Sequence, residues 1–485
     1  MRFQRCFQQW AVLHLGVARL LGVTIAVSMA LLVGAASAAD SKRPNIIFLF
    51  ADDMRGDAVG YHPGSVAITP NLNKLAKRGT NFRNAFVTTS ICCVSRATIF
   101  SGQWVRRHGI ETFQTPFTPE AWQQTYPAKL REAGYHTGFI GKFGVGDAKE
   151  IAAMQPHFDY WKGLPGQGGN DFIDPKDPKK QHQTAKFGDQ DLSLLKVPRP
   201  TSRFAYRLAL LPHARDRHPV NEFEADSRDL ELYADQDLPR SPLETDEAFR
   251  ATPPFVQTSE GRPRYERRFS SPELTLRTKR NYYRLITGID REIGRIVETL
   301  QQKGLADNTV IIFTADNGFA LGDRGMSDKW YMWEEDIRVP MLIVDLRIPA
   351  EKAGREVDAI ALNADMAPTI LSLAGVKVPE VMQGSNLVPF VQGEKPANWR
   401  KDFFYEHHTL EDQLAPSEGI RTESLKYIRW TVPRKEKKGS DARAEELYDL
   451  TKDPHEQHNL ISDPAYAAQL TSLRKRWEEQ AAALK

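Results

Sequence analysis

The chain has 485 residues, of which 41% are hydrophobic and 26% are charged. This balance is typical of a folded globular protein and excludes a disordered chain, and the length predicts one large α/β domain with a smaller one. Because 65 basic residues stand against 62 acidic ones, the net charge is only +3, which gives no electrostatic basis for nucleic-acid binding.

The first residues have the features of a secretory signal peptide. Arginines accompany an apolar run over residues 20–33, and the small residues Ala36-Ser37-Ala38 follow it. A membrane anchor is the alternative, but the run is short for a bilayer span, so we expect residues 1–38 to be removed. We expect an exported protein without a stable membrane anchor, in the periplasm or outside the cell.

Alternating strands and helices then predict a doubly wound α/β sheet with helices on both faces. Residues 45–50 are a nearly continuous apolar run, as expected for a strand buried on both faces. Apolar residues between 282 and 300 recur at helical spacing. In chain order, the sequence predicts a strand over 45–50, helices over 70–78 and 127–133, a strand over 135–140, a helix over 282–300, and strands over 310–313 and 341–344.

Two further regions complete the predicted organisation. Residues from about 150 to 270 are rich in Pro, Asp, Arg and Lys with little periodicity, so we expect mostly surface loops that shape a substrate site. After about residue 400, β-leaning pieces are followed by a helix over 464–485. The sequence therefore predicts a catalytic domain over residues 39–400 and a small α+β subdomain over residues 401–485.

Polar pairs follow two of the buried strands. Asp52-Asp53 end the first predicted strand, and Asp316-Asn317 end the strand over 310–313. Ligands bind at the carboxyl ends of the strands in open α/β sheets, and gathered carboxylates repel one another unless a cation neutralises them. Oxygen ligands suit Ca²⁺ or Mg²⁺ better than Zn²⁺. Each pair alone is explained as well by a helix cap or a tight turn, but together they favour a metal site.

The chain has three cysteines, Cys6, Cys92 and Cys93. Cys6 lies in the predicted signal peptide, and neighbouring cysteines rarely pair with each other. Two buried apolar side chains are the ordinary explanation of Cys92-Cys93. The residues that surround the two cysteines favour a different explanation.

Cys92-Cys93-Val94-Ser95-Arg96 is followed by a short run that ends in Ser101-Gly102. This segment resembles the signature of the sulfatases, in which a cysteine is followed by any residue, then proline, serine and arginine. Several fixed positions agree, and the departure is Val94 at the proline position. In that family the first cysteine is converted to formylglycine, so the resemblance implies a formylglycine at Cys92 and a maturation enzyme that makes it.

The resemblance covers nearly the whole mature chain, from Pro44 to about Leu460. Residues 44–53, 309–318 and 325–340 resemble the family's two metal-binding strands and its lysine segment, and residues 446–454 resemble its closing motif. The implied fold is the alkaline-phosphatase-like α/β sandwich with a small C-terminal sheet. The resemblance implies five ligands of a Ca²⁺ or Mg²⁺ ion, namely Asp52, Asp53, the modified Cys92, Asp316 and Asn317.

The resemblance also implies catalytic roles. Arg96 would hold the formylglycine hydroxyl, Lys329 would bind sulfate, and Lys142 would be a second site lysine. Gly144 stands where the family often has a histidine. Residues 204–213 resemble the family's strand that ends in an active-site histidine, so we expect His213 to act as the acid. Solvated surface positions are the alternative for the lysines and for His213.

We therefore expect hydrolysis of a sulfate ester. The hydrated aldehyde would attack sulfur, the acid would protonate the leaving alcohol, and the second hydroxyl would expel sulfate. Exported sulfatases often act on sulfated glycans, so a sulfated carbohydrate or small molecule is the expected substrate. A phosphodiesterase or phosphonate monoester hydrolase on the same fold is the alternative, and a non-catalytic glycan-binding relative is a further one.

Overall fold

The computed structural model describes residues 43–166, 181–196, 204–210, 223–408, 414–431 and 444–484, and of residues 196 and 204–210 the backbone alone. The predicted signal peptide and His213 lie outside these residues. Residues 45–485 form one compact unit. Within the described ranges, every helix is too short or too polar to cross a bilayer.

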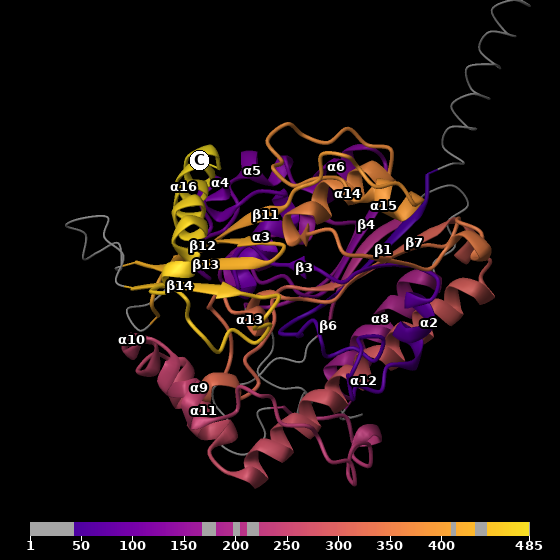
Figure 1. Ribbon diagram of the computed structural model, residues 1–485. Helices are drawn as coiled ribbons and strands as arrows, with labels where there is room; N and C mark the ends of the chain where they lie inside the picture. The colour runs from indigo at the N-terminus through magenta and orange to yellow at the C-terminus, as the bar shows by residue number, and fades with distance from the viewer. Residues whose placement is uncertain are drawn as a thin grey trace, which may run out of the picture. The chain divides into compact units, whose positions relative to one another are not determined.

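A mixed sheet lies at the centre of this unit (Figure 1). Among the described residues it has eight strands, in the order β5-β4-β6-β1-β7-β8-β2-β9. The strands from β5 to β7 are parallel, and β8 is antiparallel to both β7 and β2. Their bounds are β1 Asn45–Ala51, β2 Thr80–Phe82, β4 His136–Lys142, β5 Tyr160–Leu164, β6 Phe204–Leu210, β7 Thr309–Ala315, β8 Met341–Asp345 and β9 Arg355–Val357. The predicted doubly wound α/β class is confirmed.

The paired strands β1 and β7 are the innermost part of the sheet. Every residue of both strands is buried, which is why their sequences are apolar runs without alternation. They pair in parallel from Asn45 opposite Thr309 to Ala51 opposite Ala315. The two strands therefore end side by side, and the residues that follow them emerge at the same edge of the sheet.

Helices cover both faces of the sheet (Figure 1). On one face α12 (Pro272–Gln302) packs against α2 (Pro70–Ala76) and α8 (Gln183–Lys196). On the other face α14 (Met366–Leu373) packs against α3 (Cys92–Ser101) and α6 (Tyr126–Glu132). The predicted helix over 282–300 is the apolar part of α12, which begins earlier because the Ser271 side chain accepts a hydrogen bond from the Leu274 amide.

The expectation of mostly loop over residues 150–270 is wrong for much of that region. It contains α8, the central strand β6 and three short helices, α9 (Asp246–Ala251), α10 (Pro254–Gln257) and α11 (Gly261–Phe269). Helices of four to nine residues are too short for a clear apolar period, and of the three only α9 begins with a side-chain cap, at Thr245.

The last part of the chain forms a second, smaller sheet. Four antiparallel strands lie in the order β11-β12-β13-β14 among the described residues. They are β11 Asp402–His407, β12 Ser417–Thr422, β13 Leu425–Trp430 and β14 Ala444–Asp449, and α16 (Ala467–Ala483) follows them. The predicted strand pieces and closing helix are confirmed, while a domain boundary at residue 400 stays a prediction, because both sheets belong to one compact unit.

Candidate active site

The polar pairs after β1 and β7 meet where the two strands end. All four side chains are fully buried. The backbone amide of Asp53 donates to Asp316 Oδ1 over 3.1 Å, and Asn317 Nδ2 donates to Asp53 Oδ1 over 2.7 Å. Asp53 has a φ of +54°, an uncommon value for a residue other than glycine, so its backbone is held in a strained turn. The predicted pairs are thus one cluster rather than two independent caps.

Cys92 is the first residue of α3, and its side chain joins this cluster. Its Sγ and carboxylate oxygens of Asp52 and Asp316 all lie within 4.8 Å of one another. Cys93, by contrast, packs in the hydrophobic core. Burial raises the pKa of the Cys92 thiol, although Lys142 and Lys329 act to lower it. The ordinary explanation of a buried apolar cysteine therefore fits Cys93, while Cys92 faces the polar site.

Arg96 lies one helical turn after Cys92, on the same face of α3. Its Nε donates to Asp316 Oδ2 over 2.7 Å, and its Nη2 is 3.5 Å from Asp52 Oδ1. Its Nη1 donates to the backbone carbonyl of Lys142 over 2.5 Å. The guanidinium, which is fully buried, therefore ties together the ends of β1, β7 and β4.

Two buried lysines add positive charge to the same carboxylates. Lys142 ends β4, and its Nζ lies 2.9 Å from Asp52 Oδ2. Lys329, in a loop after β7, pairs with Asp53. Burial lowers the pKa of both lysines, but the acidic neighbours together outweigh it, with Asp52 foremost for Lys142 and Asp53 for Lys329, so both pKa values are raised and both side chains are charged. The solvated-surface alternative is excluded for both.

The donor set fits a hard divalent cation. Carboxylates and an amide supply the oxygens that Ca²⁺ and Mg²⁺ bind. Asn317 Oδ1 is buried and, within the described part of the chain, accepts no hydrogen bond, as expected for an atom shaped to bind a cation. Burial, and next the neighbouring Asp52, raise the pKa of Asp316 to about 7, because negative charge is crowded here.

Gly144 leaves space for the side chain of Arg96. Its φ is +79°, and a Cβ built on it would lie 2.7 Å from Arg96 Cδ. Any larger residue at position 144 would therefore strain the backbone and push Arg96 away from the carboxylates. The sequence shows the absence of the family's histidine, but the close approach of Arg96 could be found only from the structure.

Sequence reasoning also missed Arg264, Arg268 and Asp328. Asp328 precedes Lys329 and binds both arginines, which lie one turn apart on α11. The i, i+4 spacing of the two arginines is a signal that they share one helix face. It was not recognised because the region was expected to be loop.

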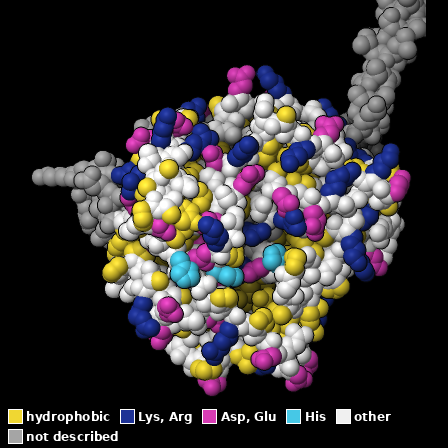
Figure 2. All heavy atoms as spheres, in the orientation of Figure 1, with side chains coloured by type: hydrophobic (Ala, Val, Ile, Leu, Met, Phe, Trp, Pro, Cys, Tyr) yellow, Lys and Arg dark blue, Asp and Glu magenta, His cyan; other side chains and the backbone are white. Residues whose placement is uncertain are grey.

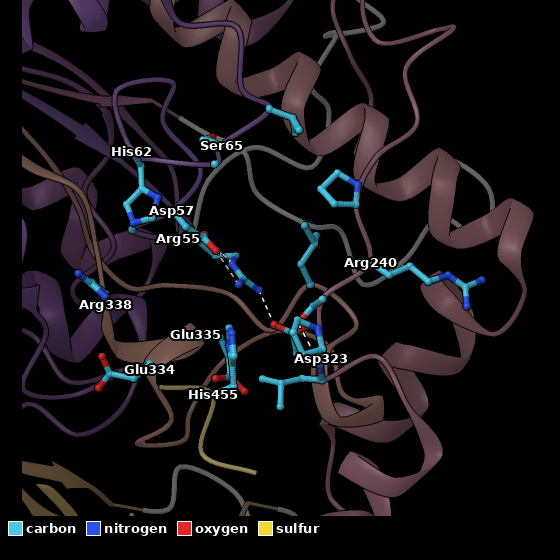
Figure 3. Close-up of a pocket in the computed structure, with 18 of the residues that line it drawn as sticks. Arg55, Asp57, His62, Ser65, Arg240, Asp323, Glu334, Glu335, Arg338 and His455 are labelled. Carbon is cyan, nitrogen blue, oxygen red and sulfur yellow. Dashed lines mark hydrogen bonds and ion pairs between the residues drawn. The ribbon is translucent and has the colours of Figure 1, made fainter. Parts of the chain in front are cut away.

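Figure 3 shows a separate cavity of about 340 Å³. None of the predicted site residues that the structure describes lines it. Arg55 in its wall binds Asp323 over 2.7 Å, and the Arg55 amide donates to Tyr282 Oη, which donates to the Asp53 carbonyl. The face drawn in Figure 2 is hollowed near its centre, where histidine, acidic and basic side chains gather.

Comparison with known proteins decides between the families that share this fold. The family model described as "Sulfatase" matches residues 44–376, which hold every predicted site residue. The chain belongs to the sulfatase family. A second family model, the C-terminal part of N-sulphoglucosamine sulphohydrolase, matches residues 322–483. The predictions of a sulfatase in the alkaline phosphatase superfamily and of a sulfuric ester hydrolase are confirmed.

Two relatives of this sulfatase cover most of its length. It is 29% identical to an N-acetylglucosamine-6-O-sulfatase of Bacteroides thetaiotaomicron, over 91% of this chain and 86% of the relative. It is 28% identical to an arylsulfatase of Clostridium perfringens, over 89% of this chain and 93% of the relative.

Solved structures share the fold. A protein in complex with its substrate D-glucosamine-2-N,6-O-disulfate has a TM-score of 0.77 and 26% identity, over 91% of this sulfatase and 98% of that chain. A phosphonate monoester hydrolase of Agrobacterium radiobacter has a TM-score of 0.75, over 91% and 96% of the two chains, and its 22% identity shows the fold alone.

Proposed function

We propose that this sulfatase hydrolyses sulfate esters of carbohydrates with a formylglycine made from Cys92 and a Ca²⁺ or Mg²⁺ ion. The observation that carries the proposal is the meeting of Cys92 with Asp52 and Asp316 in one buried cluster. A formylglycine would supply a hydrated aldehyde as nucleophile, and the cation would supply positive charge at the reacting oxygens.

The chain's own residues would prepare this site for a sulfate group. Asp52, Asp53, Asp316 and Asn317 would hold the cation. Arg96 fixes the orientation of Asp52 and Asp316, so the ligands need little rearrangement during the reaction. Lys329 would turn from Asp53 toward a sulfuryl oxygen, and Lys142 would add a second positive charge next to position 92.

We propose His213 as the acid that protonates the leaving alcohol. β6, the strand between β4 and β1, ends at Leu210, and His213 comes three residues later in the sequence. Gly144 supports the assignment, because its contact with Arg96 leaves no room for a histidine at position 144.

Sulfated amino sugars are the first substrates to test. One relative is named N-acetylglucosamine-6-O-sulfatase, and a structural neighbour was solved with D-glucosamine-2-N,6-O-disulfate. We therefore propose a sulfated glucosamine unit as substrate. We also propose that residues 1–38 direct export and are removed, and that a maturation enzyme modifies Cys92 despite Val94.

Turnover of a defined panel tests this proposal. Purified protein whose Cys92 is converted is offered 6-O-sulfated N-acetylglucosamine, an aryl sulfate, an aryl phosphate and a phosphonate monoester, with Ca²⁺ or Mg²⁺ added. We expect sulfate release from the sugar and little or no phosphate release. Faster turnover of the phosphate or the phosphonate would favour the alternative activity on this fold, and no turnover of any compound by converted, metal-loaded protein would favour the non-catalytic relative.

A further inference from the structure

The loop that carries Lys329 has an unusual backbone. Asp328 has a φ of +81° and Trp330 a φ of +103°, so left-handed residues other than glycine stand on both sides of the lysine. Such conformations are strained for residues with a side chain and persist only where neighbouring contacts impose them. The contacts that hold this loop in its strained conformation come from residues outside the loop. These residues therefore affect the position of Lys329.

These contacts come mainly from α11. Arg268 Nη1 donates to Asp328 Oδ2 over 2.6 Å and to Ser327 Oγ over 2.8 Å. Arg264 Nη1 donates to the same Asp328 oxygen over 2.9 Å, and its guanidinium lies 5.1 Å from the centre of the Trp330 ring. One helix face thus holds the residues on both sides of Lys329.

The backbone of the loop is held at further points. The Ser327 amide donates to the Gly261 carbonyl over 3.1 Å, at the start of α11. The Ala320 amide donates to the Asp328 carbonyl over 2.5 Å, and Tyr331 Oη donates to Ser259 Oγ over 2.6 Å. The segment that contains Lys329 is therefore fixed along its length.

The charges also favour this arrangement. Asp328 and the Arg268 side chain are almost fully buried, 2% and 1% exposed. Arg264 also pairs with Glu260 over 2.9 Å, so two arginines are matched by two carboxylates. Both arginines bind Asp328, while Lys329 pairs with Asp53. Asp328 serves as the anchor of the loop, and Lys329 is left to face the site.

We propose that Arg264 and Arg268 of α11 are positioning residues that clamp Asp328 and thereby set the place of the sulfate-binding Lys329. The inference rests on the proposed role of Lys329. It gives α11, a helix in the charged segment before α12, a part in the binding of the sulfate group that it does not itself contact.

Two conservative variants test the clamp. Arg268→Lys keeps the charge but cannot reach both Asp328 and Ser327 with the geometry of a guanidinium, and Arg264→Met keeps the Arg268–Asp328 pair that supports folding. Arg267→Met, at the exposed neighbouring position of α11, is the matched control. Each is made in metal-loaded protein with converted Cys92. We measure kcat, KM, the inhibition constant of inorganic sulfate, bound metal and the melting temperature.

We expect each clamp variant to raise KM and the sulfate inhibition constant together, with a loss in kcat/KM on the order of 10²-fold for Arg268→Lys, because Lys329 shifts by about an ångström. Bound metal stays the same, and Arg267→Met matches the parent. Clamp variants that melt earlier but keep the parent sulfate inhibition constant would overturn the inference, because a merely structural role predicts that result.

Combination with Lys329→Ala separates the inference from the proposed role of the lysine. If the clamp acts through Lys329, Arg268→Lys adds no further rise in the sulfate inhibition constant when Lys329 is already absent. If the two effects multiply, the clamp does not act through Lys329 and the inference is wrong. If Lys329→Ala leaves the sulfate inhibition constant unchanged, it is the proposed role of Lys329 that fails.

Discussion

The two lysines of the site reach the same group of carboxylates by different means. Lys142 ends β4, which pairs on both sides with parallel strands, and Arg96 binds its carbonyl, so the sheet and the neighbouring α3 place it beside Asp52. Lys329 lies in a loop with strained neighbours and needs α11 to hold it beside Asp53. A charge on a strand end is positioned by the sheet, while a charge on a loop depends on contacts that lie far away in the sequence.

The largest loss of activity is expected when one of the carboxylates beside the two lysines is removed. Asp316→Ala removes a carboxylate that completes the proposed cation site and that orients Arg96. We expect loss of bound Ca²⁺ or Mg²⁺ and a fall in kcat/KM on the order of 10³-fold or more. Asp345→Ala, at the end of β8 and the opposite edge of the sheet, is the control and should keep both. If inactive Asp316→Ala still binds stoichiometric metal, Asp316 is a turn residue and not a metal ligand.

The proposed proton donor, His213, comes three residues after the last residue of β6 in the sequence. A sugar alcohol needs protonation to leave, whereas a nitrophenolate does not. His213→Ala should therefore slow hydrolysis of a sugar sulfate by roughly 10²–10⁴-fold and leave an activated aryl sulfate nearly unaffected. Steady-state rates on the two substrates check this. Equal losses on both, or none on either, would show that His213 is not the acid.

Replacing each lysine compares the one at a strand end, Lys142, directly with the one in a loop, Lys329. Lys142→Met and Lys329→Met should each lower kcat/KM by on the order of 10²-fold, because each removes positive charge from the sulfuryl group in the transition state. Neither should weaken cation binding, since removing a positive charge beside the carboxylates lowers repulsion of the ion. Titration with Ca²⁺ measures this. Loss of the cation in either variant would make that lysine a support of the metal ligands instead.

The smallest expected effect concerns the loop after β4. Gly144→Ala places a Cβ against Arg96 Cδ, while Gly146→Ala, at a similar φ of +88°, places one 2.8 Å from Glu150 Cβ. Both should lower the melting temperature, because both strain a left-handed position. Gly144→Ala alone should also lower kcat/KM, by roughly tenfold. Equal kinetic losses in the two variants would mean that Gly144 matters only for its backbone.

The part of the site that sequence reasoning found consists of local signals. The runs of β1 and β7 are apolar because both faces are buried, and parallel pairing brings their terminal carboxylates together. The Cys92–Arg96 spacing is one turn of α3 and is visible in the sequence itself. These features depend on neighbours along the chain or on the sheet, so a pattern can predict them.

The part that was missed depends on contacts between distant segments. Trp330 carries no turn signal, and Ser327-Asp328 carries only a short one, although Asp328 and Trp330 both adopt left-handed backbone conformations. Arg264 and Arg268 belong to a highly charged helix that is typical of a solvated surface by composition, and their shared partner is 60 or more residues away. The composition of residues 150–270 predicts loops, and a strand at the position of β6 was expected from the family resemblance alone, because its place in the sheet is set by its partners β4 and β1.

The mass of the tryptic peptide spanning residues 84–96 tests the central claim most directly, because it contains both Cys92 and Cys93. The peptide is taken from protein that releases sulfate from a sulfated sugar, and fragment ions separate the two positions. We predict conversion of Cys92 to the aldehyde and an unmodified Cys93, which packs in the core. Active protein in which Cys92 is an intact cysteine, or in which Cys93 carries the aldehyde, would contradict this account of the site.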